Sequence, residues 1–411
     1  MLGANLTIYG LLLSNIYAPA PMYSNVRSLS MINTKIRYFY NPIMFNCQKI
    51  ILQSSFFTNS LASVIRVNSD LEKIQNRNIS TRISDFSPNV TSLFVNNCIF
   101  SNIESNESGG AIYFVDTSVG VTITRSTFQN CLTSSSDVTN ARGGALFLNV
   151  ESATFAGLCF INCTGSIGQS FYVETKAQYF VHLSEISVIH CNHKNQTLAN
   201  QPMHIGIGDI TAVFVNSSNN IVTNNDDSIC GFYLFSEIGN ITVAYSNVLN
   251  SDGGSSFYFQ GGVPHQLLYL SNIFNVTSKS ENPTLFFSGL LLVQSCAFIN
   301  TGSAPIVKPL MYSAVEFYRC EISAPLPESG QIINAESKFG VKDGRTLRIH
   351  FPLQNECKWA GYDEDYFYTP TPIPTEKHLT KGAIAGITIG CCVFVIIITI
   401  IAVVCIMKRS D

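Results

Sequence analysis

The chain has 411 residues, a formal net charge of -3 and 12% charged residues, about half the share in an average soluble protein. It contains no basic block, which argues against a nucleic-acid-binding protein. Asparagine, serine, threonine, isoleucine and phenylalanine are abundant, and this mixture favours strands and polar turns over helices.

A ten-residue phrase that ends in asparagine recurs along the chain. It reads LTIYGLLLSN at 6–15, VTITRSTFQN at 121–130, ITVAYSNVLN at 241–250 and LLVQSCAFIN at 291–300. No cationic segment typical of a signal peptide precedes the first copy. Because residues 6–15 already form a copy of the phrase, we expect the given start of the sequence to lie inside the repeat array.

Each phrase holds two alternating apolar runs separated by a shift in parity. Val121 and Ile123 share one face, and Ser126, Phe128 and Asn130 share a face after the shift. Because side chains alternate across a strand, the shift predicts a corner between two inward-facing runs. Looser copies of the phrase end at Cys191, Asn216, Asn275 and Ala324.

A third short strand is predicted in each interval between phrases. From Phe100 onward the phrase recurs about every 24–34 residues, a period typical of solenoids. Two-residue hairpin turns are rare, which argues against a sandwich or barrel. The sequence therefore predicts an all-β, right-handed parallel β-helix of the pectin-lyase type over residues 1–350. The third strands are AIYFV (111–115), ALFLN (145–149), SFYVE (170–174), SFYFQ (256–260) and TLFFS (284–288).

The terminal asparagine has a structural role in such a coil. Equivalent residues of successive coils lie about 4.8 Å apart, and asparagine tolerates the left-handed backbone of a sharp corner. We expect its amide to bond to the coils on either side and to satisfy turn groups that would otherwise be buried unpaired. The predicted ladder comprises Asn102, Asn130, Asn162, Asn250, Asn275 and Asn300.

Two motifs, SGGAIYF at 108–114 and RGGALFL at 142–148, precede third strands and follow a Phe-x-Asn. Together with the phenylalanine-rich asparagine motifs, they resemble the GGA-(Ile/Leu/Val) and FxxN repeats of the chlamydial polymorphic membrane proteins and of similar trichomonad surface proteins. The resemblance covers residues 1–350 and implies a β-helical surface protein that serves adhesion to host cells. The spacing here is mostly F-x-N, and DGGSSFYF is a degenerate third GGA copy. We interpret the glycines as corner residues.

Several segments depart from the repeat. Residues 68–90 and 192–206 interrupt it and are expected to form protruding loops. Residues 351–368 include WAGYDEDYFY and are expected to cap the last coil, because an open solenoid end exposes unpaired strand edges. The proline-rich residues 369–381 are expected to form an extended stalk.

Residues 382–407 carry no charge and are long enough to cross a bilayer as a transmembrane helix. Lys408 and Arg409 follow directly, so residues 408–411 are expected to be a cytosolic stub. The expected topology is a single-pass type I protein of the plasma membrane with an extracellular N-terminal domain.

The residues before this segment contain sequons and cysteines that suit an oxidising compartment. Cys131 and Cys163 follow the asparagines of adjacent coils and are predicted disulfide partners. The spacing of the cysteines lacks the companion pairs of a zinc site, so no metal or cofactor is expected. Candidate glycosylation sites are Asn5, Asn78, Asn89, Asn106, Asn162, Asn195, Asn216, Asn240 and Asn275.

Three functions are compatible with this architecture. A polysaccharide lyase or glycoside hydrolase needs clustered carboxylates on an outer face, but the acidic residues are scattered and His182 and His190 lack a nearby nucleophile. A passive glycosylated spacer requires only the fold. We expect a non-enzymatic surface protein that binds host cells, matrix or glycans, and no nucleic acid. An exposed aromatic patch on one lateral face would favour binding over the spacer.

Overall fold

The described part of the chain is all-β. No helix that could cross a membrane occurs within it. The chain divides into two compact units, Met1–Ala360 and Gly361–Asp411, and every described residue belongs to the first. The predicted cap, stalk, span and stub (351–368, 369–381, 382–407 and 408–411) lie outside the described residues. The computed structural model describes residues 4–16, 26–42, 49–68, 92–134, 141–191, 201–222, 228–261, 266–278, 283–301, 305–309, 313–325 and 332–341.

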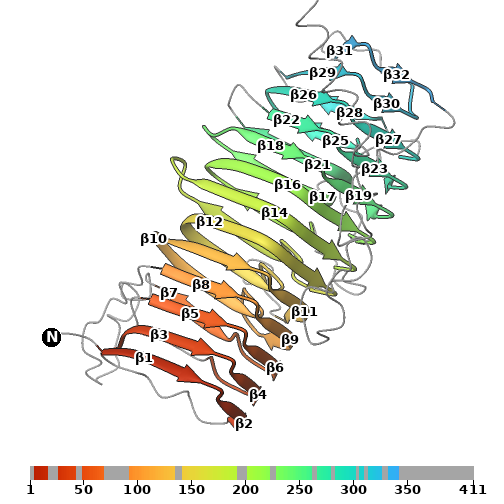
Figure 1. Ribbon diagram of the computed structural model, residues 1–411. Helices are drawn as coiled ribbons and strands as arrows, with labels where there is room; N and C mark the ends of the chain where they lie inside the picture. Colours follow the sequence, from red (N-terminus) through yellow and green to blue (C-terminus); the bar gives the residue numbers. More distant parts are fainter. Residues whose placement is uncertain are drawn as a thin grey trace, which may run out of the picture. The chain divides into compact units, whose positions relative to one another are not determined.

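The strands form a parallel solenoid. Every strand pairing among the described residues is parallel, and the strands pair with their equivalents in neighbouring coils. Figure 1 shows the strands lying one above another in chain order. The predicted parallel β-sheet solenoid is therefore confirmed.

The coils have three faces. The first and second faces carry the first and second halves of the ten-residue phrase, and the third face carries the strand that follows the phrase. The first face carries β1 (Ala4–Tyr9), β3 (Val26–Ile32), β5 (Lys49–Gln53), β8 (Ser92–Asn96), β18 (Ile241–Ala244), β22 (Gln266–Tyr269), β26 (Leu290–Gln294), β29 (Ala314–Tyr318) and β31 (Ile332–Ala335). The second face carries β2 (Leu12–Ile16), β4 (Lys35–Phe39), β6 (Phe56–Ser60), β9 (Ile99–Ser105), β11 (Thr127–Thr133), β19 (Asn247–Leu249), β23 (Asn272–Phe274), β27 (Ala297–Ile299), β30 (Glu321–Ile322) and β32 (Lys338–Phe339).

The third face corresponds to the predicted third strand of each period. It carries β7 (Ile65–Asn68), β13 (Phe171–Thr175), β15 (Met203–Gly206), β17 (Ile229–Ser236), β21 (Ser255–Gly261), β25 (Leu285–Phe287) and β28 (Val307–Pro309). Four long strands continue across corners, namely β10 (Ile112–Thr124), β12 (Leu146–Ile161), β14 (Phe180–Ile189) and β16 (Asp209–Ser218). A separate pair consists of β20 (Asp252–Gly253) and β24 (Thr277–Ser278).

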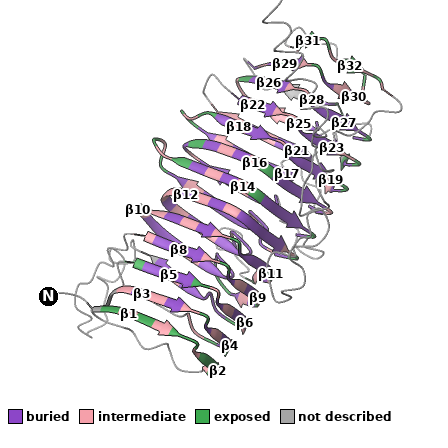
Figure 2. Cartoon of the chain, viewed as in Figure 1, coloured by how far each residue is buried: buried purple, intermediate pink, exposed green. Residues whose placement is uncertain are grey.

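The core is built from like residues stacked on like residues. Buried and half-buried positions alternate along the strands (Figure 2), as the sequence pattern predicts. On the second face, the ring of Phe128 stacks on Phe100 at 4.8 Å and on Phe160 at 5.0 Å between centroids. Each of these rings is fully buried. An inward phenylalanine therefore contacts its equivalent in the next coil.

Both ends of the second face are corners with left-handed backbone. The predicted parity shift coincides with the first corner, where φ lies between 44° and 65°. At the second corner φ lies between 48° and 58°. The first corner accepts Gly10, Asn33, Ser54, Asn97, Arg125, Gly157, Glu185, Phe214, Tyr245, Leu270, Ser295, Arg319 and Glu336. The second corner, called the asparagine corner below, holds Asn15, Tyr38, Asn59, Asn102, Asn130, Asn162, His190, Asn219, Asn250, Asn275 and Asn300.

Hydrogen bonding between side chains explains why only one of these corners selects asparagine. The Nδ2 of Asn130 donates to the Oδ1 of Asn102 at 2.7 Å, and the Nδ2 of Asn162 donates to the Oδ1 of Asn130 at 2.8 Å. Asn275 donates to Asn250 in the same way at 2.9 Å. An amide both donates and accepts, so a stack of identical amides can continue from coil to coil.

The predicted bonding of the ladder amides to the coils on either side is confirmed, since Asn130 donates to Asn102 and accepts from Asn162. Their predicted position is wrong, because the ladder side chains lie at an exposed or half-exposed edge and do not share the inward face of Phe128. The amides therefore bond to one another and not to buried turn groups. The physical reason is the left-handed φ itself, which turns the chain at this residue and ends the strand's alternation.

The repeat register also differs from the prediction in places. His190 and Asn219 occupy the asparagine corner where copies ending at Cys191 and Asn216 were expected. One copy was missed, in which Ile36 pairs with Leu13 and with Phe57. The expected loop 192–206 contains strand β15, which pairs with β13 and β17. The expected loop 68–90 lies almost wholly outside the described residues.

The paired glycines have the predicted corner role. Gly109 and Gly143 have φ of 71° and 63°. A Cβ on Gly110 would lie 2.1 Å from the carbonyl oxygen of Gly144 in the next coil, so a side chain cannot fit between these coils.

Replacement of Asn130 tests the separate contributions of backbone and amide. We expect Asn130→Gly to lower the free energy of unfolding by about 1 kcal/mol, because two amide hydrogen bonds at an exposed edge are lost. Asn130→Ala should cost about 1 kcal/mol more, because alanine disfavours the left-handed region. Arg125→Ala, at the first corner, is the matched control and should change stability by less than about 0.5 kcal/mol. Equal effects at both corners, measured by chemical denaturation, would contradict a stabilising ladder.

Candidate functional site

One lateral surface of the solenoid carries an unbroken row of outward aromatic side chains. The row lies on the third face, where the residues on either side of each ring point inward; Ile112 and Phe114, for example, are fully buried beside Tyr113. Parallel register places the members in direct succession. This aromatic row consists of Tyr113, Phe147, Tyr172, His204, Tyr233, Tyr258 and Phe286.

The rings of the aromatic row stack face to face. Centroid separations range from 4.1 Å, between Tyr172 and His204, to 5.2 Å, between Tyr113 and Phe147. The interplanar angles lie between 6° and 13°. Because neighbouring rings cover the faces, the row presents ring edges and tyrosine hydroxyls, with Tyr172 itself buried at 4% exposure and the other members half-buried. Ring edges are electropositive, so they suit oxygen-rich ligands.

Two arginine side chains lie against rings of the aromatic row. The guanidinium of Arg66 lies 4.6 Å from the Tyr113 centroid and also pairs with Glu107. The guanidinium of Arg142 lies 5.2 Å from the Tyr172 centroid. Register places Arg66 directly before Tyr113, so it occupies the next position of the row. Arg66, at the end of the row, is attracted by the quadrupole of the Tyr113 ring. Arg142 instead donates to the hydroxyl of Tyr172, whose faces Phe147 and His204 cover.

A polar cluster lies in the middle of the row. The Tyr172 hydroxyl donates to Glu174 Oε1 and accepts from Arg142 Nη1 at 3.3 Å. His204 Nε2 lies 3.8 Å from the same carboxylate oxygen, and Gln201 Nε2 lies 2.8 Å from His204 Nδ1. If the glutamine donates to Nδ1, the imidazole carries its proton on Nε2 and directs it toward Glu174.

The protonation of this cluster follows from its surroundings. Burial lowers the pKa of His204 below its ordinary value, and the nearby carboxylate of Glu174 only partly opposes this. Burial alone would raise the pKa of Glu174, but the nearby imidazole of His204 and the hydrogen bond from Tyr172 outweigh burial and leave the pKa lowered. Burial, followed by the bond to Glu174, raises the pKa of Tyr172. At neutral pH the cluster is a carboxylate, a neutral imidazole and a phenol.

The described residues hold no group of three or more histidine, cysteine, aspartate or glutamate side chains that could bind a metal ion. Glu174 is the carboxylate of the polar cluster; it accepts from the Tyr172 phenol and lies near the His204 imidazole, while Arg142 donates to Tyr172. His182 and His190, weighed from the sequence, lie on the first face and at the asparagine corner respectively, and His204 belongs to the row instead. The adjacent acidic residues Asp226 and Asp227 lie outside the described residues.

The predicted disulfide between Cys131 and Cys163 is wrong, since both thiols are free and buried. The sulfur of each donates to main-chain carbonyls, that of Cys163 to Phe128 at 3.4 Å and that of Cys131 to Phe100 at 3.6 Å. In-register parallel neighbours keep their Cβ atoms about 4.8 Å apart, whereas a disulfide requires about 3.5–4.5 Å. Cys159 is disulfide-bonded, and none of the other described cysteines is its partner.

The candidate glycosylation sites fall into three groups. Asn5, Asn106 and Asn240 are exposed, as are the ladder residues Asn162 and Asn275. Asn216 is fully buried, so a glycan there is incompatible with this fold. Asn78, Asn89 and Asn195 lie outside the described residues.

Sequence reasoning missed the aromatic row although its signal was present. Each expected third strand has an aromatic residue at its centre, as Tyr113, Phe147 and Tyr172 show. Aligning the strands on that centre would have revealed a shared outward column. Glu174 and His204 carried no comparable signal, because only the coil register brings them together.

Comparison of the chain with known protein families, with curated proteins and with solved structures finds no match.

Lowering the pH should destabilise the fold in two steps. The pKa of His204 in the folded chain lies below 6.5. Below about pH 6.5 the unfolded chain therefore binds a proton more readily than the folded chain, which lowers the free energy of unfolding. The folded pKa of Glu174 lies below 4.5, so its stabilisation is lost below about pH 4.5. We expect His204→Phe, which keeps a ring in the stack, to abolish the upper step in denaturation midpoints measured across pH. His190→Phe at the exposed corner is the control; an unchanged upper step in His204→Phe would refute the assignment.

Proposed function

We propose that the chain is a helix-anchored cell-surface protein, non-enzymatic, whose right-handed, pectin-lyase-like parallel β-helix binds host cells, matrix or glycans. The observation that carries the proposal is the aromatic row, in which successive coils present an outward ring on one face. The core does not require it, because outward positions of a strand need no aromatic residue to fold.

Three features support a surface location. Residues 382–407 are uncharged and precede Lys408 and Arg409. The sequon asparagines Asn106 and Asn240 are exposed. The disulfide at Cys159 suits an oxidising compartment.

The aromatic row favours binding over the two alternatives. A passive spacer requires stacking inside the coil but no particular chemistry on an outer face. A uronate-cleaving enzyme places several carboxylates and cations around an acidic sugar, whereas the row presents ring edges and hydroxyls with one carboxylate, Glu174, that already accepts from Tyr172. Tyrosine-rich surfaces are typical of recognition sites, since their rings add contact area with little loss of conformational freedom.

Removal of neighbouring rings tests the proposal. The full chain in detergent micelles is coated on beads and measured for attachment to cell surfaces, matrix proteins and a glycan array. We expect the double variant Tyr258→Thr, Phe286→Thr to reduce attachment about tenfold, since threonine keeps the strand but removes two contact rings.

The control for this experiment is Phe214→Asn, which removes an exposed ring from the first corner and supplies a residue that tolerates its left-handed backbone. It should leave attachment unchanged. Attachment that survives in the double variant, or turnover of a uronic-acid polymer by the parent chain, would contradict the proposal.

A further inference from the structure

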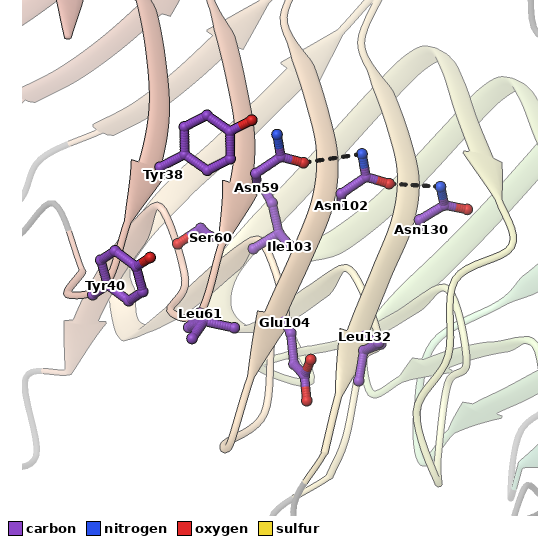
Figure 3. Close-up of a pocket in the computed structure, with 10 residues that line it drawn as sticks. All are labelled: Tyr38, Tyr40, Asn59, Ser60, Leu61, Asn102, Ile103, Glu104, Asn130 and Leu132. Carbon is purple, nitrogen blue, oxygen red and sulfur yellow. Dashed lines mark hydrogen bonds between the residues drawn. The ribbon is translucent and has the colours of Figure 1, made fainter. Parts of the chain in front are cut away.

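A second surface feature lies apart from the aromatic row, at the asparagine corner. It is an open groove of about 430 Å³ beside strands β4, β6, β9 and β11. Figure 3 shows Tyr38 and Tyr40 on one side, and Asn59, Asn102 and Asn130 in a line across its edge. Ligand pockets in proteins usually measure about 300–1,000 Å³, so the groove is large enough for a small ligand.

The amide ladder gives the groove a regular hydrogen-bonding edge. Each bond runs in one direction, from Asn102 Nδ2 to Asn59 Oδ1 at 3.2 Å and from Asn130 Nδ2 to Asn102 Oδ1 at 2.7 Å. Every ladder amide therefore retains one N–H and one carbonyl lone pair beyond the ladder bonds. Paired donors and acceptors of this kind match sugar hydroxyls, which also donate and accept.

The ladder ends at Asn59, because the next coil has Tyr38 at the asparagine corner with φ of 53°. A tyrosine offers no amide oxygen, and among the described residues no acceptor is bonded to Asn59 Nδ2. A left-handed tyrosine is not distinctive alone, since Tyr245 adopts φ of 50° at the first corner. What distinguishes Tyr38 is that it places a ring, 45% exposed, at the open end of an amide ladder.

The ring of Tyr38 differs from the rings of the aromatic row. Within the described residues no other ring stacks on it, so a face remains for a ligand, whereas the row covers its own faces. Tyr40 and Leu61 are 41% and 58% exposed and extend the apolar surface. The C–H face of a pyranose ring is the complementary surface for an open aromatic face next to amides.

The negative charge of the groove favours neutral saccharides over acidic ones. Glu104 is the charged residue among those that line it. Its carboxylate accepts hydrogen bonds from hydroxyls and repels a uronate, and no lining arginine or lysine compensates that repulsion.

We propose that this groove binds a neutral oligosaccharide. Tyr38 stacks on the C–H face of one sugar unit, Asn59 and Asn102 bond to its hydroxyls, and Glu104 accepts from a further hydroxyl and excludes acidic sugars. The site is independent of the aromatic row and of the attachment that the row is proposed to mediate.

The test measures saturation-transfer NMR and titration calorimetry on the full chain in a sugar-free detergent. The probes are cellotetraose, maltotetraose, mannotetraose and tetra-N-acetylchitotetraose, with tetragalacturonate as the acidic comparator. We expect at least one neutral probe to bind at millimolar concentration or below and tetragalacturonate to bind at least about tenfold more weakly.

The decisive variant is Tyr38→Asn. It places the residue favoured at this corner in the left-handed position and allows the ladder to continue to Asn59, so it should fold at least as stably as the parent chain. We expect it to bind the neutral probe about tenfold more weakly, because the stacking ring is gone. Glu104→Gln should leave the affinity for the neutral probe unchanged and reduce the ratio of that affinity to the affinity for tetragalacturonate.

Tyr245→Asn is the matched control, because it makes the same substitution at a left-handed tyrosine outside the groove, and it should bind as the parent does. The proposal is overturned if no neutral probe binds, if Tyr38→Asn binds as tightly as the parent, or if tetragalacturonate binds as tightly as the neutral probes.

Discussion

Parallel, in-register hydrogen bonding between successive coils is the interaction on which every other feature depends. It places each residue about 4.8 Å from its equivalent one coil away, so any side chain that stacks well with itself is selected repeatedly. Phenylalanine does so inside, where Phe100, Phe128 and Phe160 form one column. Asparagine does so at a left-handed corner, and tyrosine on the outside of the third face. Core, corner and surface are thus three results of one register.

The same register explains what the sequence could and could not predict. The Phe-x-Asn phrase predicts the second face and its corner. Both positions restrict residue choice, because one needs a ring that packs inside and the other needs a residue that tolerates a left-handed backbone. The first corner has the same backbone but, in the described residues, only isolated side-chain pairs such as Asn97–Ser54 and no continuous amide ladder, so Arg125 and Leu270 are accepted there and leave no signature. The copy ending at Tyr38 was missed because tyrosine stands there in place of the terminal asparagine by which the other copies were recognised. Proximity in register also made Cys131 and Cys163 look like partners, although parallel Cβ vectors keep their sulfurs as separate thiols.

The two surface features differ in how they use aromatic rings. In the aromatic row each ring stacks on its neighbours, so only ring edges face outward, and Arg66 and Arg142 lie nearby. At the groove, Tyr38 stands at the end of an amide ladder and keeps a face for a ligand. The proposed attachment face and the proposed sugar site are compatible on one solenoid, because each coil contributes independently to its own outer surface. The candidate chemistry could not be found from motifs, since Glu174 and His204 are neighbours only through the coil register.

The most direct test of this account is a double-mutant cycle on Phe128 and Phe160, which are far apart in sequence but stack at 5.0 Å. Free energies of unfolding are measured for Phe128→Leu, Phe160→Leu and the double variant, with Phe128 and Phe257 as a pair from separate coils. The account predicts a coupling energy of about 0.5–1.5 kcal/mol for the stacked pair and additivity within about 0.5 kcal/mol for the separated pair. Additivity in the stacked pair would contradict like-on-like stacking between successive coils.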